Sequence, residues 1–238
     1  MNIALIGYGK MGRTISKIAL SRKHNIGLII DKENRNELDR DNLRGIDVAI
    51  EFTLPDQAFD NISRCLAAGV PVVSGTTGWL NQLEAARSLC EQSGTALMYS
   101  SNFSIGVNIL FHINRQLARI MGEYSDYSVG ISEIHHSAKL DAPSGTAISL
   151  AEGIISSHGA YGSWTDEVTA GSDAILIQSA REGEVPGTHK VKWSSDIDEI
   201  SLIHKAKGRE GFALGAVLAA EYIKDKTGFL TISDMLGF

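Results

Sequence analysis

One short segment near the middle of the chain concentrates the side chains best suited to chemistry. Two adjacent imidazoles, His135 and His136, are followed closely by the amine of Lys139. Imidazole is the side chain whose ordinary pKa lies nearest to physiological pH, so it suits proton transfer. Gly145 and Thr146 then begin a predicted helix, where unpaired backbone N–H groups attract anions. The segment therefore predicts a pocket for a small carboxylate substrate, with a proton donor beside it.

The two histidines favour proton transfer over metal binding. His135 and His136 are neighbours on a predicted strand, so their side chains point to opposite faces. No cysteine or carboxylate stands at the spacing that would complete a zinc site with them. We therefore expect no metal, with one imidazole facing the substrate and the other supporting it.

The second motif is a glycine-rich turn near the start of the chain, made of Gly7, Tyr8, Gly9, Lys10, Met11 and Gly12. It lies between an apolar strand pattern and a helical pattern. Glycines in such a turn let the backbone approach a pyrophosphate at the start of the helix. An acidic residue, Asp31, follows about 20 residues later at the end of a second strand, as in dinucleotide-binding proteins. The combination predicts a dinucleotide cofactor rather than an ordinary tight turn.

The charges beside this turn leave the identity of the cofactor open between NADH and NADPH. The carboxylate of Asp31 would accept hydrogen bonds from an adenosine ribose, which favours NADH. The adjacent Lys32 would meet a 2′-phosphate, which favours NADPH. Two later loops follow strands of the same predicted sheet, at the edge where ligands bind. Their candidate cofactor-binding residues are Gly75, Thr76, Thr77, Ser100, Ser101, Asn102 and Phe103.

The first part of the chain alternates strand and helix patterns. Such alternation predicts a Rossmann-like α/β domain with a doubly wound parallel sheet. The apolar runs that we interpret as its strands are residues 3–6, 26–30, 48–52, 70–73 and 96–99. A helix and a short strand near the end of the chain resemble this domain. We therefore assign residues 1–104 plus 210–238 to one dinucleotide-binding domain.

The pattern changes within residues 105–209, which we predict to form an inserted α+β domain. A long helix pattern is followed by a half-exposed strand at 127–136 and by a helix at 144–157. Strand patterns then follow one another, which favours a mostly antiparallel sheet. Residues 158–174 are rich in glycine and serine and are predicted to form a loop. This domain contains the histidine block and would therefore bind the substrate.

The composition excludes several classes of partner. A net charge of −6 argues against binding to nucleic acid. No apolar run is long enough to span a membrane, and the chain begins directly with a strand pattern. Cys65 and Cys90 belong to no CxxC pair and are interpreted as buried thiols of a reducing compartment. We therefore expect a cytoplasmic protein with no membrane partner.

The motifs together resemble a known family. The matching segments include the glycine turn, Glu51 to Pro55, Gly75 to Gly78, Asn102 to Asn108 and the block from Glu133 to Ala147. That block, with the pattern His-His-x-x-Lys-x-Asp-x-Pro-Ser-Gly-Thr-Ala, is the most specific of them. Over nearly its whole length the sequence resembles the 4-hydroxy-tetrahydrodipicolinate reductases of diaminopimelate and lysine biosynthesis, also called dihydrodipicolinate reductases.

The resemblance implies a reaction and a set of roles. A nicotinamide would transfer hydride to a ring carbon conjugated with an imine, reducing a small dicarboxylate to tetrahydrodipicolinate. His135 would donate the proton, assisted by Lys139, while His136, Gly145 and Thr146 would bind the substrate. The family also implies a homotetramer assembled through the sheets of the second domain. A hinge closure would bring cofactor and substrate together.

Two alternatives stay open, together with the choice of nicotinamide. The compact GxGxxG turn departs from the GxGxxxG of many members of the family, and the segment after Asp31 is short. An enzymatic alternative is another nicotinamide dehydrogenase with an inserted α+β domain, such as an amino-acid or semialdehyde dehydrogenase. A different class is a non-catalytic NAD(H)-sensing protein, which would need the glycine turn but not the histidine block.

Overall fold

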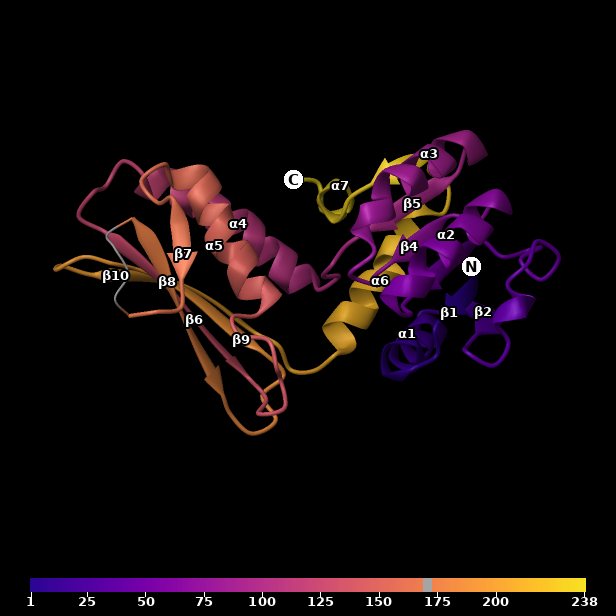
Figure 1. The fold of residues 1–238 in the computed structure, drawn as a ribbon, viewed down its shortest axis with the longest axis horizontal. Helices are drawn as coiled ribbons and strands as arrows, with labels where there is room; N and C mark the ends of the chain where they lie inside the picture. The colour runs from indigo at the N-terminus through magenta and orange to yellow at the C-terminus, as the bar shows by residue number, and fades with distance from the viewer. Residues whose placement is uncertain (169–172) are drawn as a thin grey trace. The chain divides into compact units, whose positions relative to one another are not determined.

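The structure, a computed structural model, describes residues 1–168 and 173–238 and divides them between two compact units. One unit comprises Met1–Ile105 together with Arg209–Phe238, and the other comprises Gly106–Gly208. The chain therefore leaves the first unit once, builds the second, and returns (Figure 1). Within the described ranges, no helix combines the length and the apolar character that a bilayer crossing requires.

The first unit is built on a parallel sheet of six strands. Its order is β2-β1-β3-β4-β5-β11. These strands are β1 (Asn2–Ile6), β2 (Asn25–Ile30), β3 (Val48–Glu51), β4 (Val72–Ser74), β5 (Ala96–Tyr99) and β11 (Gly228–Leu230). The strand order reverses between β1 and β3, and such a switch point opens a crevice for ligands at the carboxyl ends of the strands. The predicted doubly wound parallel fold is confirmed.

Helices cover both faces of this sheet. The helices are α1 (Lys10–Ser21), α2 (Pro55–Ala67), α3 (Leu83–Ser93), α6 (Glu210–Ile223) and α7 (Ile232–Leu236), with 3₁₀ turns at Arg35–Glu37 and Leu80–Gln82. One buried cluster joins Ile15 of α1 and Val217 of α6 to the sheet. A second cluster joins Ile62 of α2 and Cys90 of α3 to the opposite face. The sheet is thus buried on both sides, which explains why its strands are continuous apolar runs.

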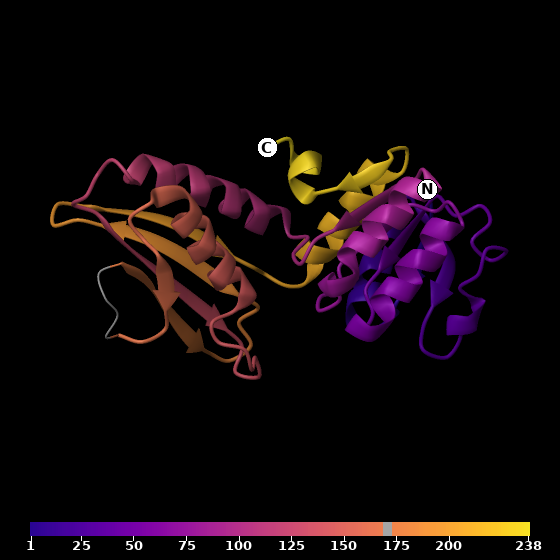
Figure 2. The ribbon, with the colours of Figure 1, turned by 45° about the horizontal axis from the view of Figure 1, so that its top comes forward.

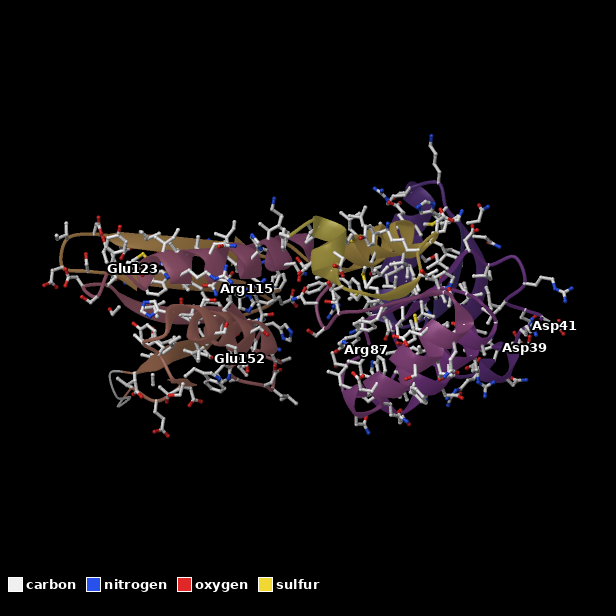
Figure 3. The ribbon with its side chains drawn as sticks, turned by 90° about the horizontal axis from the view of Figure 1, so that it is seen from above. Asp39, Asp41, Arg87, Arg115, Glu123 and Glu152 are labelled. Atoms are coloured by element: carbon white, nitrogen blue, oxygen red, sulfur yellow. The ribbon has the colours of Figure 1, made fainter. Side chains whose placement is uncertain are left out.

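The second unit packs two helices against a five-stranded sheet of order β10-β9-β6-β8-β7 (Figure 2). Its elements are α4 (Ile105–Met121), β6 (Ser128–His135), α5 (Gly145–His158), β7 (Ser163–Thr165), β8 (Ala174–Arg181), β9 (Thr188–Ser194) and β10 (Glu199–Lys205). Helices α4 and α5 are in contact where the side chain of Arg115 of α4, labelled in Figure 3, packs beside Gly153 of α5. Asn114 Nδ2 also donates to Leu150 O across this contact, over 2.9 Å.

Two predictions for the second unit are wrong. The sheet is mixed, not mostly antiparallel: β6 pairs parallel with β8 and β8 with β7, while β9 is antiparallel to β6 and β10. The crossover through α5 carries the chain back to the starting end of the sheet, so the next strands run parallel to β6. The segment predicted as a loop contains β7, a strand too short to show an alternating pattern. Residues 169–172 of that segment lie outside the described part of the chain.

Candidate active site

The glycine turn between β1 and α1 is packed so tightly that side chains are excluded from it. Gly7 has φ +94°, and a Cβ there would lie 2.0 Å from Phe52 O. A Cβ on Gly12 would lie 2.1 Å from Gly7 O, whereas one on Gly9 would meet nothing within 4 Å. The first turn of α1 contains no acidic residue, and its N-cap residue, Gly9, has no side chain with which to cap it. The open start of this helix therefore fits a pyrophosphate.

A pocket of about 300 Å³ adjoins the turn, at the carboxyl ends of β1, β2 and β3. Four predicted cofactor residues line it: Gly7, Gly9, Asp31 and Lys32. The other lining residues include Tyr8 of the turn and Phe52, Thr53 and Leu54 of the matching segment after β3. They also include two residues that the sequence did not single out, Gln57 and Asn61. The remaining residues of the turn are Lys10, Met11 and Gly12, the first three residues of α1.

The two charged residues at the end of β2 are exposed. The Asp31 carboxylate accepts the backbone N–H of Lys32 over 2.8 Å, and the Asp31 N–H donates to Asn34 Oδ1 over 2.7 Å. These bonds hold the turn after β2, so Asp31 and Lys32 stay beside the pocket rather than in a loose loop.

The two predicted loops after β4 and β5 lie at one edge of the sheet, because these strands are parallel neighbours. Of the residues there, Thr77 and Ser101 are exposed, and Gly75, Ser100 and Asn102 are partly exposed. Thr76 is buried, and its hydroxyl is bound to Glu51 over 2.8 Å. Phe103 is only 2% exposed and belongs to the core, where its ring lies 6.0 Å from that of Phe52. Its side chain thus supports the loop from beneath.

A buried carboxylate ties the ends of β3 and β4 together. Glu51 is fully buried and accepts hydrogen bonds from Ser74 Oγ over 2.7 Å and from Thr76 Oγ over 2.8 Å. It also accepts the backbone N–H of Thr53 over 3.0 Å and the Thr53 hydroxyl. Asn61 Nδ2 in turn donates to the Thr53 hydroxyl over 3.2 Å. A buried charge is tolerated when its oxygens are saturated in this way.

The Glu51→Gln variant should be less stable than the wild type. An amide keeps the volume but replaces one acceptor oxygen by a donor, which would face groups that already donate. We expect a loss of about 1–3 kcal/mol in the free energy of unfolding, measured by urea denaturation. The exposed Glu91→Gln is the control and should change it by less than about 0.5 kcal/mol. Equal stability of the two variants would show that the network contributes nothing.

In the second unit, three neighbouring strands bring charged residues together around His135. Along β6 burial alternates, and Glu133 and His135 are on its buried face, 1% and 8% exposed. The antiparallel register places His189 of β9 opposite Glu133, and the parallel register places Arg181 of β8 opposite His135. Strands β6, β8 and β9 lie together in Figure 1. Four titratable side chains thus converge at one end of the sheet.

The geometry of this cluster centres on Glu133. Its Oε2 lies 3.2 Å from His135 Nδ1 and 3.7 Å from His189 Nε2, while its Oε1 lies 3.2 Å from Arg181 Nη2. Glu133, His135 and His189 bring atoms of metal-binding types within 4.8 Å of one another. The Arg181 guanidinium, however, already places a fixed positive charge on the carboxylate, which disfavours a cation there. We interpret the cluster as one that handles protons.

Burial sets the protonation of the two imidazoles. Burial lowers the pKa of His135 below its ordinary value, and the nearby Glu133 carboxylate opposes this without cancelling it. Burial also lowers the pKa of His189, to about 4, with a further contribution from His135. For Glu133, burial acts to raise the pKa, but hydrogen bonds from Ser144 and Ser179 outweigh it and keep the pKa below the ordinary value. At neutral pH the free protein thus holds an ionised Glu133 beside two neutral imidazoles.

Helix α5 begins where the sequence predicted. Ser144 caps it: the Ser144 hydroxyl accepts the N–H of Ala147 over 3.3 Å, and the Ser144 N–H donates to Glu133 Oε1 over 3.0 Å. The amides of Gly145 and Thr146 are therefore the donors left at the start of the helix, as in known anion sites. A Cβ on Gly145 would meet nothing within 4 Å. Gly145 is exposed, so the start of the helix is open to solvent.

The loop between β6 and α5 is held in place by Arg181. Its guanidinium donates to Asp141 O over 2.6 Å and to Lys139 O over 3.3 Å. Lys139 Nζ pairs with both carboxylate oxygens of Asp141, over 2.7 and 2.8 Å. His136, the residue after β6, is half-buried. Lys139 is therefore paired in the free protein, and an incoming carboxylate would have to compete with Asp141 for it.

Sequence reasoning gave no site role to three members of this cluster. Glu133 was detectable, because it lies two residues before His135 on one strand and so shares its face. Arg181 and His189 are distant in sequence and reach the site only through the pairing of β8 and β9 with β6. Strand register of this kind is not readable from a single sequence.

The geometry can now be set beside known proteins. The family model described as "Dihydrodipicolinate reductase, N-terminus" matches residues 1–103, and its C-terminal counterpart matches residues 106–236. A protein of Christiangramia forsetii named 4-hydroxy-tetrahydrodipicolinate reductase is 51% identical over 237 residues, covering 99% of this chain and 98% of that protein. One of Methanopyrus kandleri with the same name is 37% identical and covers 80% of this chain and 71% of its own length.

A solved structure shares the fold. It is the dipicolinate-bound dihydrodipicolinate reductase from Paenisporosarcina sp. TG-14, which superimposes with a TM-score of 0.79 at 23% identity and covers 97% of both chains. The family matches span both units, and the 51% identical match covers the parts of this chain that hold the glycine turn and the histidine block. The chain belongs to the dihydrodipicolinate reductase family.

Proposed function

We propose that this chain catalyses the NAD(P)H-dependent reduction of 4-hydroxy-tetrahydrodipicolinate to tetrahydrodipicolinate, a step of diaminopimelate and lysine biosynthesis. Membership of the family and the 51% identical relative of equal length support this activity. The single observation that carries it is the histidine block: a buried imidazole lies on the strand that leads to α5, and the Ser144 cap of α5 leaves the amides of Gly145 and Thr146 as donors. That pair of features suits a substrate that carries carboxylates and must receive a proton.

The first unit would bind the nicotinamide cofactor. The tight glycine packing, the open start of α1 and the adjoining pocket fit a dinucleotide, with its pyrophosphate on the helix amides. When bound, the reduced nicotinamide supplies the hydride. Asp31 and Lys32 would contact the ribose of the adenosine, and the loops at Gly75–Thr77 and Ser100–Phe103 would line the opposite end. Closure of a hinge would bring cofactor and substrate together.

The second unit would bind the dicarboxylate. The amides of Gly145 and Thr146 would hold one carboxylate, and His136 and Lys139 would add charge-assisted hydrogen bonds. Binding releases Lys139 from Asp141, so part of the substrate's interaction energy replaces an existing ion pair. Recognition by main-chain donors selects for a carboxylate at that position rather than for the rest of the ring.

His135 would deliver the proton that follows hydride transfer. Its Nδ1 faces Glu133, so Nε2 is the atom left for the substrate. A Cβ at Gly187 would lie 3.0 Å from Nε2, so glycine keeps the neighbourhood of this atom clear. The lowered pKa means that the free enzyme holds His135 neutral near pH 7. The negative charges of a bound dicarboxylate would raise the pKa of His135. The imidazole would therefore be protonated when the substrate is bound.

We also propose a homotetramer, assembled through the sheet of the second unit, and a cytoplasmic location. Support for the tetramer comes from apolar side chains that this unit exposes on its edge strand and on α4: Ile200, Ile203, Ile109, Ile113 and Ile120. Exposed apolar side chains such as these are candidates for contacts between subunits. Support for the location comes from Cys65 and Cys90, which are buried free thiols.

The choice of nicotinamide should be balanced, with kcat/KM values for NADH and NADPH within about tenfold of each other, or roughly 1.4 kcal/mol. Lys32→Ala should weaken the binding of NADPH and leave the binding of NADH nearly unchanged, because only NADPH carries the 2′-phosphate. Asp31→Ala should do the reverse. Steady-state kinetics with each cofactor provides the test. An unchanged KM for NADPH in Lys32→Ala would make Lys32 a solvated loop residue and remove the basis for dual use.

A coupled assay tests the activity itself. A synthase generates the unstable substrate in the cuvette, and the absorbance of NADH and NADPH is followed separately. We expect oxidation of both nicotinamides that depends on the synthase product. Reduction of NAD⁺ or NADP⁺ by an amino acid or a semialdehyde, with no oxidation of NADH or NADPH by the synthase product, would instead identify a different dehydrogenase. Cofactor binding without any oxidation would identify a sensing protein.

A further inference from the structure

The two carboxylate oxygens of Glu133 lie beside different parts of the site: Oε2 beside His135 and Oε1 beside the start of α5. Its side chain is fully buried. Oε1 accepts the Ser144 N–H over 3.0 Å and the Ser179 hydroxyl over 2.9 Å, with Arg181 Nη2 at 3.2 Å. Oε2 has no aligned hydrogen bond from any described residue, and neither has His135 Nδ1, although both atoms are buried. These two atoms lie 3.2 Å apart.

Two buried polar atoms at that separation satisfy each other if the imidazole turns slightly. Buried polar groups in folded proteins are nearly always hydrogen-bonded, so the pair has a strong tendency to close. His189 is the other candidate for Oε2, but its Nε2 is farther, at 3.7 Å, and has Ser144 Oγ at 3.1 Å. The nearest donor for Oε2 is therefore Nδ1–H of His135.

We propose that Glu133 is the positioning residue of this enzyme: through Oε2 it holds His135 with Nδ1 protonated and Nε2 facing the substrate, and through Oε1 it fixes the start of α5. One carboxylate thereby fixes the position of the proton donor relative to the amides that bind the substrate's carboxylate. The inference rests on the proposed function for the role of Nε2 as the atom that protonates the substrate, but the contacts of Glu133 do not depend on that function.

The charge of Glu133 has a predictable effect on His135. The titratable and charged groups around His135 are Glu133 on β6, Arg181 on β8, His189 on β9, and Lys139 and Asp141 in the loop after β6. Among them, only the carboxylates of Glu133 and Asp141 favour the imidazolium, and Glu133 is the stronger influence. Removing its charge leaves burial, Lys139 and Arg181 acting in the same direction, so the pKa of His135 falls further.

The Glu133→Gln variant therefore shifts the proton-donor limb of the pH profile. The acid form of His135 is lost as pH rises through its pKa, so kcat/KM falls on the alkaline side of that value. Without the carboxylate the limb moves to lower pH by about 1 unit or more. At any pH above the His135 pKa of both proteins, kcat/KM of Glu133→Gln is then about tenfold or more below that of the wild type. A purely structural role would lower kcat/KM at every pH without moving the limb.

The experiment combines this profile with a titration of His135 by ¹⁵N NMR, which needs no catalysis. The full-length wild type, Glu133→Gln and Glu133→Asp are compared with Glu184→Gln, which removes the same charge from an exposed position. The imidazole shifts report both the tautomer and the pKa. We expect the Nδ1–H tautomer in the wild type and in Glu184→Gln, its loss together with a lowered pKa in Glu133→Gln, and an intermediate pKa in Glu133→Asp.

The outcomes separate this inference from the proposed function. Wild-type protein that oxidises neither nicotinamide with the substrate overturns the proposed function, while the NMR titration still decides the role of Glu133. An active wild type whose His135 pKa and tautomer are the same in Glu133→Gln overturns the inference alone. If Glu133→Gln does not fold, the Asp variant decides: a His135 pKa equal to that of the wild type contradicts the proposal.

Discussion

Replacing His135 by alanine should lower kcat by about 10²–10⁴-fold, the usual contribution of a general acid. The hydride can still be transferred, but the electron density left on the ring must then be quenched by water. Binding of NADPH should hardly change, because His135 belongs to the second unit and the cofactor residues belong to the first. Steady-state kinetics with the coupled assay gives kcat, and nucleotide fluorescence gives the cofactor Kd.

The adjacent histidine provides the matched control for this result. His136→Ala removes an imidazole from the neighbouring, half-buried position, where we assign a role in substrate binding. Its effect should appear mainly in the KM of the substrate. A wild-type-like kcat in His135→Ala, or a larger loss of kcat in His136→Ala, would remove His135 from its role as proton donor.

Substituting Gly145 by valine should weaken substrate binding by roughly 10–100-fold, the range expected for hydrogen bonds to a charged group. The space around its Cβ position is open, so the protein should fold. We expect the branched side chain to obstruct the approach of a carboxylate to the backbone N–H. Thr146→Val removes a hydroxyl and keeps the shape, and should change KM by less than about threefold, since the main-chain donors remain. The measurements are KM and the inhibition constant of a planar dicarboxylate.

Which of the two variants has the larger effect on substrate binding shows which group recognises the carboxylate. A larger effect of Thr146→Val than of Gly145→Val would mean that a side-chain hydroxyl recognises the carboxylate and that the helix amides do not. Circular dichroism of both variants shows whether α5 is retained. A loss of helix confined to Gly145→Val would make its effect structural, and the amide assignment would fail.

The sequence predicts well those features that depend on local pattern. Alternating apolar and polar residues locate β6, and the Ser144–Gly145–Thr146 segment locates the cap and first turn of α5. The glycine turn is equally local, because only glycine tolerates the backbone at Gly7, whose Cβ would lie 2.0 Å from Phe52 O. Each of these depends on residues close together in the chain.

The features that could not be predicted depend on how distant strands pair. The parallel register of β6 with β8 brings Arg181 to the loop that carries Lys139, and the antiparallel register with β9 brings His189 to Glu133. The lowered pKa of His135 has the same origin, since it results from burial beneath neighbours that are remote in sequence. The residue type alone suggested that His135 has a pKa near neutral pH. In the folded protein, burial lowers that pKa.

The most direct test of the central claim follows the hydride itself. Reduced nicotinamide carrying two deuterium atoms at C4 is supplied with freshly generated 4-hydroxy-tetrahydrodipicolinate, and the product is analysed by mass spectrometry. The account predicts tetrahydrodipicolinate with a single deuterium per molecule, formed at the rate at which the nicotinamide is oxidised. A product without deuterium, or nicotinamide that stays reduced while the substrate decays, would contradict it.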